Sequence, residues 1–130
     1  MPAWMVRCFH SVHGSDLFCK DYEKQTVKAK AEFRSTLSSL LAQPDIEGWR
    51  RPEFDRLKGR YHKLGKLRFS ANNVKHRPLG FFLPGERVFV LLIWATERDW
   101  KFDPPDVRDT AMERMTAVLA DPERATDCDL

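Results

Sequence analysis

Apolar positions in the first third of the chain follow a strand pattern and then a helix pattern. The segment AWMVRCF, residues 3–9, is rich in residue types that favour strands. After Gly14, with Ser15 as the helix cap, apolar residues recur at steps of three, four or seven, which places them on one face of a helix. They are Phe18, Tyr22, Ala29, Phe33, Leu37 and Leu40. The pattern predicts a short strand and then a long helix from about Ser15 to Ala42, with at most one internal break.

The middle of the chain loses this periodicity before a strand pattern returns. Residues 44–63 have no sustained period and predict a loop, with one short helical turn near residues 53–57. Residues 65–71 then alternate Leu67 and Phe69 against Lys66, Arg68 and Ser70. Such alternation is typical of a half-buried strand, here with a basic outer face.

Two further strands follow in close succession. Residues 76–83 form the next strand, in which Pro78 and Gly80 indicate an edge position or a bulge. Residues 88–95, VFVLLIWA, are apolar without alternation, which predicts a central strand covered on both faces. Turn residues separate the three strands, so they are expected to pair antiparallel.

The last element is a helix opened by the sequence DPPDV. Asp103 suits the cap position and Pro104 the first helical position. Its expected buried stripe consists of Val107, Ala111, Met115, Val118 and Leu119. The sequence therefore predicts one α+β domain over residues 1–121, followed by a polar, frayed tail over residues 122–130. We expect a small, curved, mostly antiparallel sheet of about four strands, with the long N-terminal helix and the C-terminal helix packed on one face.

The composition of the chain is typical of a globular domain and indicates little else about its function. No apolar run reaches the roughly 18 residues that span a bilayer, and the N-terminus lacks the pattern of a signal peptide. Three cysteines, Cys8, Cys19 and Cys128, have no zinc-like spacing. We therefore expect free thiols in the cytoplasm, no membrane association, no metal site and no cofactor.

Charge is distributed unevenly along the chain. Between Arg50 and Arg77 lie ten lysines and arginines but only two acids, a net charge of +8, while the rest of the chain carries −5. A basic surface of this kind suits a polyanion such as RNA, because bound phosphates release counterions. A solvated basic face without a partner is the alternative.

The chemistry-bearing residues of this segment fall on the predicted hairpin. The nucleotide-binding, hydrolase and metalloprotease motifs that have short local signatures do not occur. Instead, Lys66 and Arg68 share a strand face, and His76 and Arg77 begin the antiparallel neighbour. Arginine can bind a phosphate with two hydrogen bonds, and a lysine among cations or a histidine can transfer protons. These residue types suit metal-free RNA cleavage, although ordinary surface residues would look the same.

A longer pattern in this region resembles a known toxin family. The segments "GKLRF", "HRPLGFF", "ERVFVLLIWATER" and "WKFDPPDVRDTAMERM" are similar, in order, to motifs of the RelE/HigB-like toxins of bacterial toxin–antitoxin pairs, most of all their phage-derived branch. The resemblance covers roughly residues 60–120. It implies a RelE-like fold and a metal-independent endoribonuclease that cuts messenger RNA on the ribosome. It also implies a neighbouring helix-turn-helix antitoxin as partner.

The resemblance assigns roles to individual residues. Arg68 and Arg77 would bind and stabilise the phosphate, and Lys66 or His76 would be the base. The expected substrate-binding residues are His62, Lys63, Arg98 and Lys101. The family often has a Tyr or His near its C-terminal end as the acid, whereas here residues 122–130 contain neither. His62 or His76 would have to substitute for it.

Other functions remain open at this point. The missing C-terminal acid and Pro78 within the strand also fit a non-catalytic module, either a ParE-like poison of DNA gyrase or a phage-derived protein that only binds its partner. A general RNA-binding domain without cleavage is the third alternative.

Overall fold

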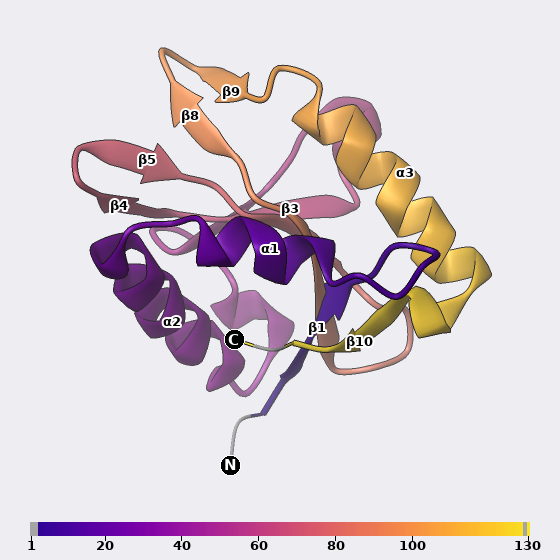
Figure 1. The fold of residues 1–130 in the computed structure, drawn as a ribbon. Coiled ribbons are helices and arrows are strands. Elements are labelled where there is room, and N and C mark those ends of the chain that lie inside the picture. Colours follow the sequence, from indigo (N-terminus) through magenta and orange to yellow (C-terminus); the bar gives the residue numbers. More distant parts are fainter. Residues whose placement is uncertain (1–2, 129) are drawn as a thin grey trace.

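Two β-sheets and three α-helices make up the described part of the chain, residues 3–128 and 130 of the computed structural model (Figure 1). One sheet has the strand order β10-β1-β7-β6-β3-β2 and the other the order β4-β5-β8-β9. The strands are β1 (Met5–Phe9), β2 (Phe54–Arg56), β3 (Leu64–Leu67), β4 (Phe69–Ala71), β5 (Val74–His76), β6 (Leu79–Phe82), β7 (Val88–Ile93), β8 (Thr96–Arg98), β9 (Lys101–Asp103) and β10 (Ala125–Asp127). The helices are α1 (Leu17–Glu23), α2 (Val27–Leu41) and α3 (Val107–Ala120), with short 3-10 turns at Ile46–Gly48, Gly59–Tyr61 and Pro122–Arg124.

Strand β7 is the centre of the larger sheet. All six of its residues are buried, and it lies between β1, which runs parallel to it, and β6, which runs antiparallel. Phe89 and Leu91 pack with residues of α1 and α2, while Val90 and Leu92 pack with residues of α3. The predicted central strand is therefore confirmed. The helices, however, cover both faces of this sheet rather than one (Figure 1).

The expected RelE-like fold with one sheet of about four strands is wrong. The predicted strands over residues 65–71 and 76–83 are each interrupted, at Arg68 and at Arg77–Pro78, and their two parts enter different sheets. The chain after β7 continues in the same way into β8, which pairs with β9 as a short hairpin. Strands of three residues are too short to show a period. The prediction therefore joined β3 with β4 and part of β5 with β6, and it did not include β2, β8, β9 or β10.

The long N-terminal helix is also wrong as predicted, because the chain forms two shorter helices. Asp16, rather than Ser15, caps α1 by accepting a hydrogen bond from the backbone N–H of Cys19. Thr26 caps α2 by accepting one from Ala29. A capping threonine starts a new helix, and it sits at the internal break that the pattern allowed.

Three local predictions have mixed outcomes. Residues 54–56 form a strand and not a helical turn. The segment containing Gly80 lies inside the sheet and not at its edge, but the expected bulge is present between Leu79 and Gly80. A Cβ atom on Gly80 would lie 2.3 Å from the carbonyl oxygen of Val90, so this close approach of two strands requires glycine.

The start of the last helix is shifted from its expected position. Asp103 ends β9, and Asp106 occupies the cap position of α3. The buried stripe of α3 is confirmed except at Leu119, which is exposed.

The C-terminal residues that were expected to fray instead form β10, which pairs antiparallel with β1. Ala125 is buried there, and a disulfide joins Cys128 to Cys8. The expectation of free thiols is therefore wrong for these two cysteines, because the fold brings together two residues that are 120 positions apart. Within residues 3–128 and 130, no helix combines the length and apolar character needed to cross a membrane.

Candidate functional site

Charged residues gather where the strands pass from the larger sheet to the smaller one. Lys66 lies near the end of β3, Arg68 follows it between the sheets, and Arg77 lies between β5 and β6. The backbone continues to pair through this junction, since Arg77 N–H donates to the carbonyl of Ala95 and Leu67 N–H donates to that of Pro78. The junction is thus a fixed platform for the side chains that project from it.

Glu97 of β8 is the anion at the centre of this group. Its Oε1 accepts a hydrogen bond from Arg77 Nε at 3.0 Å and lies 3.6 Å from Lys66 Nζ. The side chains of Arg77, Glu97 and Lys66 are only 6%, 13% and 16% exposed. Ion pairs screened from water to this extent hold their geometry much better than surface pairs do.

Arg77 is held on more than one side. Its Nη1 donates to the carbonyl oxygens of His76 and Phe69, at 2.8 and 3.3 Å. Burial lowers the pKa of the Arg77 guanidinium, and the charges of Arg68 and Arg51 act in the same direction, while Glu97 raises it. Arg77 therefore acts as a buried support for Glu97 and for the junction.

Arg68 is the cation of this group without a counterion. No described residue gives its side chain a hydrogen bond or an ion pair, and its Nε is fully buried. The charge of Arg68 lowers the pKa values of both Lys66 and Arg77, so the three cations lie close enough to repel one another. A half-buried guanidinium among other cations is costly unless an anion approaches it. Arg68 thus has the environment of an anion-binding residue.

Lys66 differs from an ordinary surface lysine. Burial lowers the pKa of its ammonium group, and the charges of Arg77 and Arg68 lower it further, although Glu97 and Asp55 oppose them. A lysine with a depressed pKa exchanges its proton more readily near neutral pH than an exposed one does.

Asp55 completes the group on the side of β2. Its Oδ2 accepts hydrogen bonds from Arg51 Nε and Nη2 at 3.1 and 2.9 Å. Burial alone would raise the pKa of Asp55, but the hydrogen bonds and charge of Arg51, and the charge of Lys66, bring it below its usual value.

His76, a predicted catalytic residue, lies instead among aromatic rings. It is 5% exposed, its ring stacks on Phe69, and its Nδ1 accepts a hydrogen bond from Trp94 Nε1 at 3.0 Å. Burial lowers the pKa of the imidazole, and the charge of Arg77 adds to this effect. The arrangement keeps His76 neutral and gives it a packing role.

The four predicted substrate-binding residues fall into two groups. Arg98 and Lys101 are directly paired across the β8–β9 hairpin and are exposed. They stand on the same hairpin as Glu97, which rises to the top of the molecule in Figure 1. His62 and Lys63 precede β3 and are also exposed, and Lys63 lines a separate cavity beside Phe82 and Met115. The structure thus brings Arg98 and Lys101 toward the site but not Lys63.

Trp100 lies at the tip of this hairpin, with 92% of its surface accessible. Asp99 and Trp100 both have positive φ, of 51° and 65°, which are values that Asn and Gly usually supply in two-residue hairpin turns. Lys75 Nζ lies 6.0 Å from the centre of the Trp100 ring. No packing in the described chain explains a tryptophan at this position.

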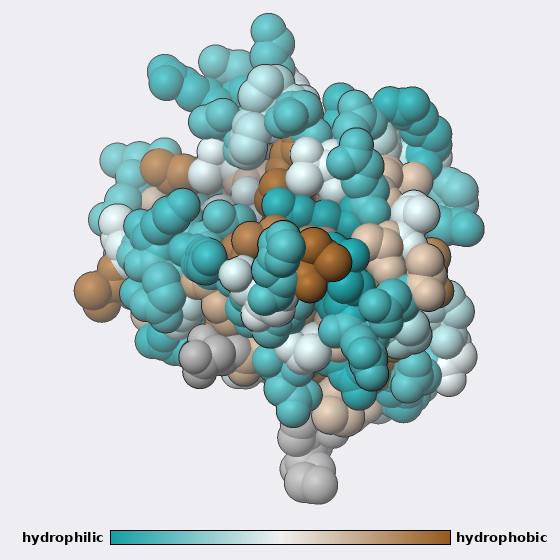
Figure 2. All heavy atoms as spheres, turned by 45° about the vertical axis from the view of Figure 1, so that its right-hand side comes forward, coloured by the Kyte–Doolittle hydropathy of each residue, from teal (hydrophilic) through white to brown (hydrophobic). Residues whose placement is uncertain are grey.

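An open cavity of about 580 Å³ lies on the hairpin side of the smaller sheet. Its lining residues are Asn73, Val74, Lys75, Thr96, Glu97, Arg98, Asp99 and Asp103. Glu97 therefore reaches both this cavity and the cation group. Figure 2 shows one face of the molecule as mainly hydrophilic, with apolar atoms only in small separate areas, so among the described residues drawn there no broad apolar patch is present.

Sequence reasoning missed Glu97 and the Arg51–Asp55 pair. Asp55 lies within the basic segment, four positions after Arg51, and this spacing was the only signal in the sequence. Glu97 lies twenty positions after that segment and had no such signal. The strand positions of β2 and β8 were not predicted, so the direction of these side chains could not be derived.

No model of a known protein family matches the chain, and no curated protein matches it with significant similarity.

Proposed function

We propose that the protein is a metal-independent endoribonuclease, the toxin of a toxin–antitoxin pair, acting on messenger RNA at the ribosome. The observation that carries the proposal is the half-buried, unpaired Arg68 beside Lys66 and Arg77, with Glu97 between the latter two. An RNA phosphate supplies the missing anion for Arg68. Glu97 and Lys66 then lie close to the bound phosphate as proton-transfer groups.

The proposed reaction uses the RNA's own 2′-hydroxyl as nucleophile. Glu97 accepts the proton of this hydroxyl, the 2′-oxygen bonds to the adjacent phosphorus, and the bond to the 5′-oxygen breaks. Lys66 donates a proton to the leaving 5′-oxygen, which leaves a 2′,3′-cyclic phosphate and a 5′-hydroxyl. Arg68 stabilises the negative charge that develops on the phosphoryl oxygens. Arg77 holds Glu97 in position and does not itself contact the RNA.

The β8–β9 hairpin provides the second half of the proposed RNA site. An exposed indole can stack on an unpaired base, and Trp100 stands between the exposed cations Arg98 and Lys101. Three positions separate Trp100 from Glu97 along the chain. One nucleotide stacked on Trp100 therefore lies near the phosphate bound at Arg68.

The partner and the location follow from the sequence resemblance. An antitoxin with a helix-turn-helix domain would block the basic site, and both proteins would act in the cytoplasm. In that reducing compartment the Cys8–Cys128 disulfide would open.

A non-catalytic binding module is the second candidate. The burial of His76 and Arg77, whose polar groups bond within the chain, favours it, because two of the residues expected to act on RNA serve the fold. On this alternative the protein binds RNA or a protein partner through the same basic surface without cleaving.

Cleavage of a short single-stranded RNA in the presence of a chelator separates the two candidates. The proposed enzyme yields fragments ending in a 2′,3′-cyclic phosphate, and induced expression in bacteria arrests growth and translation. Arg68→Ala abolishes both effects, whereas Arg50→Ala, which removes an exposed arginine of the same basic segment, leaves both in place. Binding without cleavage, with normal growth, would establish the module instead.

A further inference from the structure

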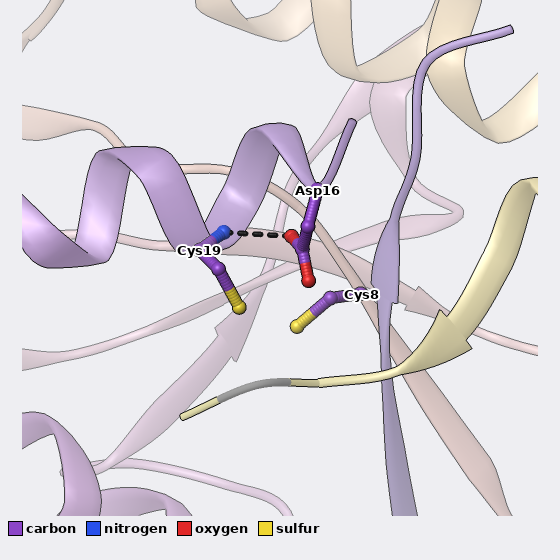
Figure 3. A group of neighbouring side chains, drawn as sticks. All are labelled: Cys8, Asp16 and Cys19. Carbon is purple, nitrogen blue, oxygen red and sulfur yellow. Dashed lines mark hydrogen bonds between the residues drawn. The ribbon is translucent and has the colours of Figure 1, made fainter. Parts of the chain in front are cut away.

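The interior beside β1 gathers metal-binding side chains from three distant parts of the chain. Cys8 lies on β1, Asp16 and Cys19 at the start of α1, and Cys128 just after β10. One ligand atom from each of Cys8, Asp16 and Cys19 lies within 4.8 Å of the other two. Figure 3 shows these three side chains pointing toward one another, and Cys128 reaches the same place through its disulfide with Cys8.

Asp16 gives independent evidence for a cation. Its Oδ1 caps α1 by accepting from Cys19 N–H at 2.8 Å, but its Oδ2 is buried and accepts no hydrogen bond from the described residues. The nearest cationic group is His10, whose Nε2 lies 3.5 Å away and carries a charge only when protonated. A buried carboxylate oxygen without a partner is rare in proteins and often marks an ion site.

We propose that Cys8, Cys19, Cys128 and Asp16 form a zinc site that opens when the Cys8–Cys128 disulfide is reduced. Three thiolates and one carboxylate are donors that Zn²⁺ accepts in tetrahedral sites. In the oxidised protein the disulfide occupies two of the four donors, so the remaining pair binds zinc weakly. The site is independent of the proposed RNA chemistry, since its residues lie on β1, α1 and the C-terminal segment.

The redox step is balanced by a thiol or phosphine reductant. Two electrons from the reductant break the Cys8–Cys128 bond. A thiol reductant supplies the two protons and becomes its disulfide, whereas with a phosphine one water supplies both protons and the oxygen of the phosphine oxide. Zinc binding then displaces the thiol protons. Sulfur atoms around zinc are about 3.8 Å apart, given Zn–S distances of about 2.3 Å. The sulfur atoms of Cys8 and Cys19 lie within 4.8 Å of each other and need to approach by about 1 Å at most, while Cys128 moves away from Cys8.

In the reduced protein, zinc would replace the disulfide as the link between the C-terminal segment and β1. Strand β10 pairs with β1 through three residues at the edge of the sheet and is held there by Cys128. A metal bound to Cys8 and Cys128 keeps the C-terminal segment attached under reducing conditions. The C-terminal strand would then be anchored in both redox states, by different bonds.

The test uses the full chain, with and without a phosphine reductant, and measures Zn²⁺ binding against a chelating dye. The reduced protein is expected to bind one Zn²⁺ per chain tightly and the oxidised protein to bind it much more weakly. Co²⁺ in place of Zn²⁺ should give the intense thiolate-to-cobalt absorption of a site with several sulfur ligands. A reduced chain that binds no zinc, or a disulfide that the reductant does not open in the folded protein, would overturn the proposal.

Two variants keep the disulfide and so report on the site alone. Cys19→Ser and Asp16→Asn each remove one donor, and each should weaken zinc binding to the reduced protein by about 100-fold. Asparagine still caps a helix, so α1 is preserved. Glu23→Gln removes an exposed acid from the same helix and should leave the affinity unchanged. Equal affinity in all three variants would show that zinc binds elsewhere and contradict the assignment.

Discussion

Arg77 Nε donates to Glu97 Oε1 across 3.0 Å, at the place where the chain passes from one sheet into the other. Lys66 shares the same carboxylate oxygen. A buried ion pair adds little net stability when intact, but loss of one partner leaves an uncompensated buried charge. Glu97 therefore has a structural role that can be separated experimentally from its proposed role in proton transfer.

Glu97→Gln is expected to lower the free energy of unfolding by about 3 kcal/mol, because Arg77 stays buried without a countercharge. Urea unfolding at neutral pH measures this loss. Glu86→Gln, in the exposed turn between β6 and β7, serves as the control and should change stability little. If the two variants are equally stable, Glu97 does not hold the junction together. In the double variant Arg77→Met, Glu97→Gln part of the stability should return, since the buried guanidinium without a countercharge is gone.

Arg68→Ala should separate function from stability. Removing an unpaired cation beside Lys66 and Arg77 relieves repulsion, so the free energy of unfolding should stay the same or rise by about 1 kcal/mol. RNA affinity should fall, and the slope of its salt dependence should decrease by about one phosphate contact. Filter binding over a range of salt concentrations measures both quantities. A marked loss of stability, with the salt slope intact, would mean that Arg68 supports the fold and not the RNA.

Trp100→Asn tests the hairpin tip. Loss of one stacked base should weaken binding of single-stranded RNA by about 1–3 kcal/mol, roughly 5- to 150-fold. Stability should be maintained or improved, because asparagine tolerates positive φ better than tryptophan does. In the wild-type protein, RNA should also quench the fluorescence of this exposed indole. Trp49→Phe, at a buried position, is the control for the fluorescence signal. Unchanged RNA affinity in Trp100→Asn would remove the hairpin from the proposed site.

The sequence pattern predicts best where one element stays in one environment. The six-residue strand β7 and the buried stripe of α3 both show a clear apolar pattern, and both are confirmed apart from Leu119. The pattern fails where the chain passes from one sheet into the other, at Arg68 and at Arg77–Pro78, because the backbone hydrogen bonds continue through the junction while the partner strands change. Periodicity reports which side of a strand is buried but not which sheet the strand joins.

For the candidate site, too, one part could be predicted from the sequence and another could not. Clustering of Lys66, Arg68 and Arg77 was predictable, since they lie on the two consecutive segments, residues 65–71 and 76–83, that were expected to pair antiparallel. The different environments of Arg68, Arg77 and His76 were not, because they depend on Glu97 and Trp94, which come from the chain after β7. The cysteine cluster was likewise beyond the sequence pattern, since Cys8 and Cys128 meet only through the pairing of β10 with β1.

His76 provides a test at acid pH. Its folded-state pKa is lowered by burial and then by Arg77, while the unfolded chain titrates near 6.5. Well above pH 6.5 the imidazole is neutral in both states and contributes no pH dependence. As the pH falls below 6.5, the unfolded chain binds a proton that the folded protein resists, so the free energy of unfolding decreases until the pH passes the folded-state pKa.

The hydrogen bond from Trp94 opposes protonation as well, in addition to burial and the charge of Arg77. Protonated His76 would carry a hydrogen on Nδ1, which would then face the Nε1–H of Trp94, two donors without an acceptor. His76→Gln keeps an acceptor oxygen but does not titrate, so the loss of stability between about pH 6.5 and 5 should become smaller. His62→Gln, at an exposed position, should retain the full loss. Urea unfolding at a series of pH values measures the difference.

RNA cleavage by His76→Gln should remain within about tenfold of the wild type, since a group that acts as a general base contributes 10²-fold or more. A larger loss of cleavage, with the fold intact, would show that His76 takes part in catalysis, as the sequence predicted.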